Sequence, residues 1–174
     1  MNHNDHVNLL RNGIHVPQGT WADLGAGRGA FTLALADLLQ ANSTIYAIDK
    51  KANDLQYLQQ SMVKSFPEIE LQLLLADFTK GLNLPPLDGI VMANSLHFIA
   101  NKKPFLTQMR GWLKTNGRFL LVEYNVEKGN HWVPYPISFI HWQQQASHYG
   151  FQKTELLAKR PSHFLGEIYA AASW

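Results

Sequence analysis

Three glycines and one aspartate near the start of the chain have the types and the spacing that suit nucleotide binding. Gly25, Gly27 and Gly29 directly follow a short apolar stretch, residues 20–24. Glycine lets the backbone turn sharply and a ligand come close, and the free N–H groups that open the next helix then face that ligand. A second apolar stretch ends in Asp49, and an acidic residue at that place suits the two hydroxyls of a ribose. The pattern predicts a cofactor that contains adenosine.

The same glycines also satisfy the dinucleotide fingerprint G-x-G-x-x-G/A, which here ends at Ala30. A nicotinamide-dependent oxidoreductase is therefore an alternative. A tight strand-to-helix turn that binds no ligand is a second alternative. The strand expected before the glycines, the helix expected after them and Asp49 beyond that helix favour a cofactor site.

Composition limits the kind of protein. The 174 residues suit one domain with a real core, and 46% hydrophobic against 16% charged residues is typical of a globular chain. The 15 basic and 13 acidic residues leave a formal charge of +2, which gives no electrostatic reason to expect a nucleic-acid partner. The chain has no cysteine, so disulfides, thiolate metal sites and cysteine nucleophiles are excluded.

Localisation follows from two absences in the sequence. Residues 1–6 are polar and lack the apolar core of a signal peptide. No apolar run is long enough to span a bilayer. We therefore expect a cytoplasmic protein with no membrane partner, and the sequence does not indicate its oligomeric state.

The order of apolar segments predicts an α/β fold. Strands are expected at residues 20–24, 44–49, 71–76, 90–93 and 118–123, and helices at residues 5–13, 28–41, 52–65, 102–114 and 137–149. Residues 152–159 and 166–173 look like two further strands, and their short link permits only an antiparallel pair. The prediction is a single-domain, doubly wound, Rossmann-like sheet of seven strands, mostly parallel with one antiparallel strand near the C-terminal edge. Residues 1–18 form an N-terminal extension that could act as a lid.

Several motifs in this order resemble those of class I S-adenosylmethionine-dependent methyltransferases. Residues 23–29 resemble the first motif of that family, and Asp49 matches the acidic residue that ends its second strand. Residues 76–78 resemble the adenine-binding motif, and residues 94–98 occupy the segment after the fourth strand. Residues 113–119 resemble the turn before the fifth strand, with threonine and asparagine in place of the usual proline and glycine. The resemblance covers almost the whole chain and implies one methyltransferase-like domain over residues 1–174.

The resemblance implies S-adenosylmethionine as the cofactor and a set of residues that bind it. Asp23 would help to hold the methionine ammonium group, Asp49 the ribose hydroxyls and Asp77 the adenine amino group. Phe78 would lie near the adenine ring, and the backbone of Asn94 would line the methionyl side. The implied cofactor residues are Asp23, Gly25, Gly27, Asp49, Asp77, Phe78 and Asn94. From the residues alone, Asp77 could instead cap a turn, Phe78 could be a core residue and Asn94 could simply end its strand.

Methyl transfer from a sulfonium needs little from the enzyme beyond alignment and the exclusion of water. A general base is needed only when the acceptor must lose a proton. His97 is the best candidate for that base because it follows the fourth strand and histidine titrates near neutral pH. A histidine packed into the wall is the alternative for His97, and His131 is a weaker candidate. The eight histidines show no metal-ligand spacing, so no metal site is expected.

Two arguments predict the class of the acceptor: the aromatic residues of the long loop after the fifth strand, and the exclusion of nucleic-acid acceptors. Tyr124, Trp132 and Tyr135 could form a flat aromatic wall for a small organic acceptor, or the last two could anchor the loop. No N/D-P-P-Y motif follows the fourth strand, and no basic stretch suggests a nucleic-acid track. A small-molecule acceptor methylated on O or N is therefore favoured. A non-catalytic S-adenosylmethionine-binding module and a protein acceptor are the alternatives.

Overall fold

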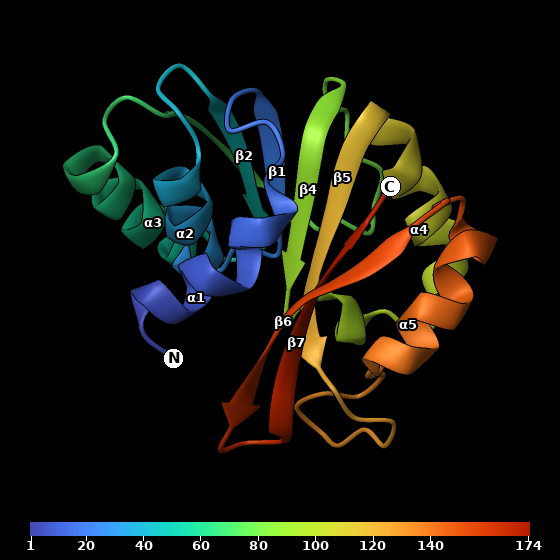
Figure 1. Ribbon diagram of the computed structural model, residues 1–174. Coiled ribbons are helices and arrows are strands. Elements are labelled where there is room, and N and C mark those ends of the chain that lie inside the picture. Colours follow the sequence, from blue (N-terminus) through green and yellow to red (C-terminus); the bar gives the residue numbers. More distant parts are fainter.

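The computed structural model describes residues 1–174 and contains one seven-stranded sheet with helices on both faces (Figure 1). The strands run in the order β3-β2-β1-β4-β5-β7-β6. Strands β1 to β5 pair in parallel, and β7 runs antiparallel to both β5 and β6. The predicted fold class is confirmed. The strands are β1 (Thr20–Leu24), β2 (Thr44–Asp49), β3 (Glu70–Leu75), β4 (Leu87–Ala93), β5 (Leu113–Tyr124), β6 (Thr154–Ser162) and β7 (Gly166–Ser173).

The helices divide between the two faces of the sheet, as Figure 1 shows, with α1, α2 and α3 on one side and α4 and α5 on the other. The α-helices are α1 (His3–Leu10), α2 (Ala30–Leu38), α3 (Ala52–Ser65), α4 (Lys102–Trp112) and α5 (Phe139–Gln145). Three short 3₁₀ helices are η1 (Arg11–Gly13), η2 (Leu96–Phe98) and η3 (Ala146–Tyr149). None of the helices combines the length and the apolar character that crossing a membrane requires.

Local chemistry explains where the elements differ from the predicted ranges. Helix α2 begins at Ala30, later than expected, because Gly29 before it has a left-handed backbone (φ +89°). A side chain at Gly29 would also overlap Leu58 of α3. The helix expected at 137–149 is two pieces, α5 and η3, and the chain then turns at Gly150 (φ +91°). Strand β5 begins five residues earlier than 118 because Leu113 already pairs with Leu87 across a bulge.

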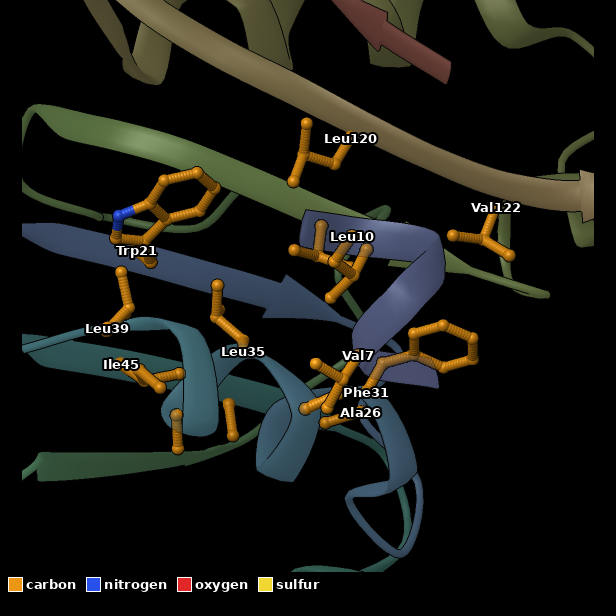
Figure 2. Packing of buried hydrophobic residues seen from close by; sticks show 14 of the residues in the cluster. Val7, Leu10, Trp21, Ala26, Phe31, Leu35, Leu39, Ile45, Leu120 and Val122 are labelled. Carbon is orange, nitrogen blue, oxygen red and sulfur yellow. The ribbon is translucent and has the colours of Figure 1, made fainter. Parts of the chain in front are cut away.

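Helix α1 is part of the core on the face shown in Figure 2. Val7, Leu9 and Leu10 are buried there, and Figure 2 shows Val7 beside Phe31 of α2. An Asn2–Asp5 capping box starts α1, and Arg160 of β6 pairs with Asp5. The predicted N-terminal extension is therefore held to the body of the fold by buried apolar side chains, and its use as a lid stays a prediction.

Candidate functional site

The largest cavity lies where the parallel strands end. It has a volume of about 650 Å³ and is bordered by the residues that follow β1, β2, β3 and β4. The ends of parallel strands meet at one edge of a sheet, which is where ligands bind in open α/β folds. The lining residues predicted from the sequence are Gly25, Gly27, Asp49, Asp77, Phe78, Asn94, His131 and Trp132. The lining residues not predicted are Lys50, Lys51, Asp54, Ala76, Thr79, Ser95, Phe98 and Ile99.

The glycine loop between β1 and α2 shapes the floor of this cavity. Gly25 has a positive φ of +87°, and a Cβ added there would lie 2.7 Å from Cβ of Ser95. The Ser95 hydroxyl donates to the carbonyl of Leu24 at 2.7 Å and holds the ends of β1 and β4 together. Gly27 also has a positive φ (+53°), but a Cβ there would meet nothing within 4 Å. Close packing therefore requires glycine at position 25, whereas the space beside Gly27 is open.

Asp49 is bound to the glycine loop. Its Oδ2 accepts the N–H of Gly27 at 2.8 Å, and its Oδ1 accepts the N–H of Lys51 at 2.9 Å. Each carboxylate oxygen can accept more than one hydrogen bond. Both oxygens of Asp49 are therefore held in place and still have capacity for two hydroxyl donors from the cavity.

Asp77 and Phe78 lie side by side on the cavity wall after β3. The backbone N–H and the hydroxyl of Thr79 both donate to Oδ1 of Asp77, at 3.0 and 2.6 Å, and these two bonds lower the pKa of Asp77. Oδ2 of Asp77 has no partner within the chain and can accept from a ligand. The ring of Phe78 packs against Phe105 at 5.6 Å between centroids. Asp77 therefore caps a turn, and its Oδ2 stays available to a ligand.

Asp23 is a buried acid next to the glycine loop. Its side chain is 1% exposed and accepts a 2.6 Å hydrogen bond from the Thr32 hydroxyl. Burial raises the pKa of Asp23 from 3.8 to about 7, against the opposing effect of Thr32 and with a further rise from nearby Asp49. Asp23 borders a second cavity of about 230 Å³, which Met1 and His6 also line. A cationic ligand group in this cavity would favour the ionised form of Asp23.

Asn94 connects the two cavities and has an unusual conformation. It lines both of them, and its backbone is left-handed (φ +53°) in a residue other than glycine. Its N–H donates to the carbonyl of Val122 at 2.8 Å, but its buried Oδ1 has no hydrogen-bond partner. A strained backbone and an unpaired buried acceptor are both costly, and such features persist at binding sites. These two features support Asn94 as a candidate ligand-binding residue.

His97 is placed differently from the other predicted site residues. It is 2% exposed and lines neither cavity. Its Nδ1 lies 2.8 Å from Oε2 of Glu123, whose other oxygen accepts the backbone N–H of His97 at 3.1 Å. Glu123 is fully buried at the end of β5. His97 is therefore hydrogen-bonded to Glu123, a partner that was not predicted from the sequence.

Of the three aromatic residues predicted to form the acceptor wall, only one lines the large cavity. Trp132 borders the cavity and is 69% exposed, whereas Tyr124 and Tyr135 do not line it. Tyr124 packs edge to face on Phe164, in the turn between β6 and β7. Phe98 of η2 is 61% exposed and lines the cavity with Trp132. Phe98 was missed because a single apolar residue in a short turn carries no periodic signal.

The side chains form no group of three or more His, Asp or Glu residues that could hold a metal ion. The polar groups at the cavity are hydrogen-bond acceptors instead: one acidic side chain at the end of β2, one after β3, and an unpaired amide oxygen after β4. This arrangement can bind an elongated ligand that presents hydroxyl and amino donors.

Most of the chain matches a known protein family. Residues 16–160 match a family model described as a methyltransferase domain. No curated protein matches the sequence.

Solved structures show the same fold at low sequence identity. An S-adenosylmethionine-dependent methyltransferase from Leishmania major is 19% identical with a TM-score of 0.78, and the match covers 99% of this chain and 72% of that one. The YcgJ protein of Bacillus subtilis is 14% identical with a TM-score of 0.74, and 98% of each chain is covered. The N-terminal domain of EvdMO1 with S-adenosylhomocysteine bound is 17% identical with a TM-score of 0.71, over 99% of this chain and 81% of that one.

Proposed function

This chain belongs to the methyltransferase domain family, and we propose that it transfers a methyl group from S-adenosylmethionine to a small organic acceptor, on oxygen or nitrogen. The solved structures with this fold include an S-adenosylmethionine-dependent methyltransferase and a domain with S-adenosylhomocysteine bound. The cofactor of this chain is accordingly S-adenosylmethionine. When bound, it supplies an electrophilic methyl group on a positively charged sulfur. The protein then has to orient the acceptor and exclude water.

The residues present fit that cofactor. Asp49 and Asp77 offer free acceptor capacity for ribose hydroxyls and an adenine amino group. The buried carboxyl of Asp23 and the unpaired Oδ1 of Asn94 suit the cationic methionine end. The open space beside Gly27 leaves room for a ligand against the backbone. We assign these residues, with Gly25 and Phe78, to the cofactor site.

The acceptor class is inferred mainly from the rim of the cavity. Phe98 and Trp132 expose 61% and 69% of their surface at the same cavity that Asp49 and Asp77 line. Large aromatic groups at the mouth of a pocket favour a small, partly apolar ligand. The absence of a basic aromatic track in the sequence supports the same choice. The exposure of Phe98 and Trp132 at this cavity is the main support for a small organic acceptor.

The loop between β5 and α5 is held in a defined conformation, which supports its role as an acceptor wall. Oδ1 of Asn130 accepts the N–H groups of Trp132 and Val133 at 2.8 and 2.9 Å. The N–H of Tyr135 donates to the carbonyl of His97 at 3.1 Å. Nζ of Lys102 donates both to this loop, at the Tyr135 carbonyl, and to the carbonyl of Ile99. A loop that is ordered before binding loses less entropy when an acceptor binds.

Replacing Asp49 tests the cofactor site. Asp49→Ala is expected to weaken binding of S-adenosylhomocysteine about tenfold to a hundredfold, since hydrogen bonds to a charged group are worth roughly 1.5–3 kcal/mol. Asp49→Asn, which keeps an acceptor oxygen, is expected to lose less. Calorimetric titration of the folded variants measures both. Equal affinity in Asp49→Ala and the wild type would remove Asp49 from the site.

Replacing Trp132 tests the acceptor wall. Trp132→Ala is expected to lower methyl transfer by about tenfold or more, the equivalent of roughly 1.4 kcal/mol of lost packing, because the acceptor loses a large apolar surface. S-adenosylhomocysteine affinity should stay within a few-fold of the wild-type value. Release of S-adenosylhomocysteine in the presence of small phenols and amines is the readout for transfer.

Ile140→Ala is the matched control for Trp132→Ala. Ile140 is another exposed apolar side chain, on α5, and it lines neither cavity. Its truncation should leave both transfer and cofactor affinity unchanged. Loss of cofactor binding in Trp132→Ala alone would place the loop in the cofactor site and contradict the assignment of an acceptor wall.

A further inference from the structure

The buried pair of His97 and Glu123 has no role in the cofactor site described above. The two side chains are 3% and 0% exposed, and Nδ1 of His97 lies 2.8 Å from Oε2 of Glu123. The same carboxylate accepts the backbone N–H of His97 through Oε1. A buried carboxylate with both oxygens directed at one residue holds that residue's backbone and ring together. Because a carboxylate only accepts hydrogen bonds, the ring hydrogen on this side belongs to Nδ1.

The other ring nitrogen of His97 is left free. Nε2 makes no hydrogen bond within the chain, and it is not among the fully buried polar side-chain atoms that lack a partner. The small exposed part of the side chain therefore includes Nε2. His97 lies between Ser95 and Phe98, which both line the large cavity. Nε2 of His97 therefore reaches the protein surface within residues 95–98, the segment that contributes Ser95 and Phe98 to the large cavity.

The charged and titratable groups around the pair do not compete for the role of base. Tyr124 of β5 is half-buried, and burial and the nearby Glu123 raise its pKa. Burial and Glu123 also raise the pKa of Tyr169 of β7 well above its usual value, and its hydroxyl donates to the carbonyl of Ile137. Burial lowers the pKa of Lys102 of α4, opposed by the negative charge of Glu123, and its Nζ is occupied by two carbonyls.

We propose that Glu123 is a positioning residue that keeps the hydrogen of His97 on Nδ1, so that Nε2 takes a proton from the acceptor during methyl transfer. This proposal rests on the proposed function and narrows its acceptor to a hydroxyl compound. The acceptor oxygen bonds to the methyl carbon as the bond from that carbon to the positive sulfur breaks. The electron pair of that bond goes to sulfur, and the hydroxyl proton goes to Nε2 of His97. The resulting imidazolium is stabilised by the buried carboxylate of Glu123.

The surroundings of His97 favour a phenol over an aliphatic alcohol. The ring of His97 lies 4.3 Å from that of Phe98 and 6.4 Å from that of Tyr124, between centroids. Tyr124 in turn packs on Phe164 at 5.7 Å. Aromatic rings in offset or tilted contact stabilise one another beyond simple burial. A phenolic ring stacked on Phe98, which is 61% exposed and lines the cavity, would bring its hydroxyl toward the neighbouring ring of His97.

The first test measures the protonation of His97 directly. Long-range proton–nitrogen NMR spectra of ¹⁵N-labelled protein, with and without S-adenosylhomocysteine, identify the protonated ring nitrogen, and His97→Asn assigns the signals. The expected result at about pH 8 is a hydrogen on Nδ1 and none on Nε2. In Glu123→Gln the preference for Nδ1–H should be lost, because the amide can donate as well as accept. A hydrogen on Nε2, or a doubly protonated ring throughout the range from about pH 6 to about pH 9, would overturn the proposal.

The second test compares two acceptors of different acidity, phenol and 4-nitrophenol. Removing a general base typically costs about 10²- to 10⁴-fold in rate. Glu123→Gln and His97→Asn should therefore lower kcat with phenol at least about a hundredfold, with little change in KM. The loss should be much smaller with 4-nitrophenol, because an acceptor that is already ionised needs no base. An equal loss with both acceptors would assign the pair a structural role and contradict the proposal.

Matched controls exist for both variants. Glu127 and His141 form a second Glu–His pair at 3.7 Å that is exposed and lies outside the large cavity. His141→Asn, which removes this exposed pair from the α5 side, should leave the rate and the His97 spectrum unchanged, as should His148→Asn and, for the carboxylate, Glu155→Gln on the exposed edge strand β6. Failure of S-adenosylhomocysteine to bind the wild type would contradict the proposed function. A doubly protonated His97 in a protein that binds S-adenosylhomocysteine would contradict the roles proposed for His97 and Glu123 and leave the proposed function standing.

Discussion

Gly27→Ala is expected to weaken S-adenosylhomocysteine binding at least about a hundredfold, the equivalent of roughly 3 kcal/mol, and to leave the fold intact. Gly27 lines the large cavity, and a Cβ there would meet no protein atom within 4 Å. The methyl group would therefore occupy space that the cofactor needs against the backbone. The cost to the folded protein is limited to the left-handed φ of +53°, about 1–2 kcal/mol for an L-residue.

Gly81→Ala is a control that separates the loss of cofactor affinity from the loss of stability. Gly81 has nearly the same backbone conformation (φ +58°) and open surroundings, but it lines neither cavity. Both variants should lose similar stability in urea unfolding, and only Gly27→Ala should lose affinity in calorimetry. Wild-type affinity in Gly27→Ala would show that the cofactor does not pass beside this glycine.

Asp23→Asn is expected to stabilise the cofactor-free protein and to weaken cofactor binding. The carboxyl of Asp23 has its pKa raised from 3.8 to about 7 by burial. As pH rises between these values, the unfolded chain has lost the proton while the folded chain still holds it, so the free energy of unfolding falls. Above pH 7 the cost reaches about 4 kcal/mol, since each pH unit between two pKa values corresponds to about 1.4 kcal/mol. An amide at this position carries no such cost.

Urea unfolding as a function of pH measures the first effect. Asp23→Asn should gain about 2–4 kcal/mol over the wild type at about pH 8, and the gain should vanish near pH 4. A gain that does not depend on pH would show that the pKa of Asp23 is the same in the folded and the unfolded protein. Asp37→Asn, on the exposed surface of α2, should show no such dependence.

The same carboxyl links cofactor affinity to pH. A methionine ammonium group beside Asp23 favours the carboxylate, so binding below pH 7 must release the proton that the free protein holds. Wild-type affinity for S-adenosylhomocysteine should therefore fall as pH decreases below 7, by up to about tenfold per pH unit. Asp23→Asn should bind more weakly at pH 7 and show no such fall. A pH-independent wild-type affinity would place the ammonium group away from Asp23.

Much of the proposed cofactor site could be predicted from the sequence because its signals are local. The glycine loop, the strand before it and Asp49 at the end of the next strand lie within thirty consecutive residues. Apolar runs indicate buried strands and helical spacing indicates amphipathic helices, because burial follows the period of each element. These signals led to the correct fold class. They also selected Gly27, Asp49, Asp77 and Asn94, which the structure gathers around one cavity.

The residues proposed for the acceptor side come together only through contacts between distant segments. His97 and Glu123 are 26 residues apart and meet because β4 and β5 are neighbours in a fixed register. Phe164 reaches Tyr124 only because β7 pairs antiparallel with β5. The sequence by itself determined which elements form and which residues follow each strand, since both depend on local chemistry. Only the tertiary structure decided which side chains meet, because strand register and the burial of one carboxylate are properties of the packed sheet.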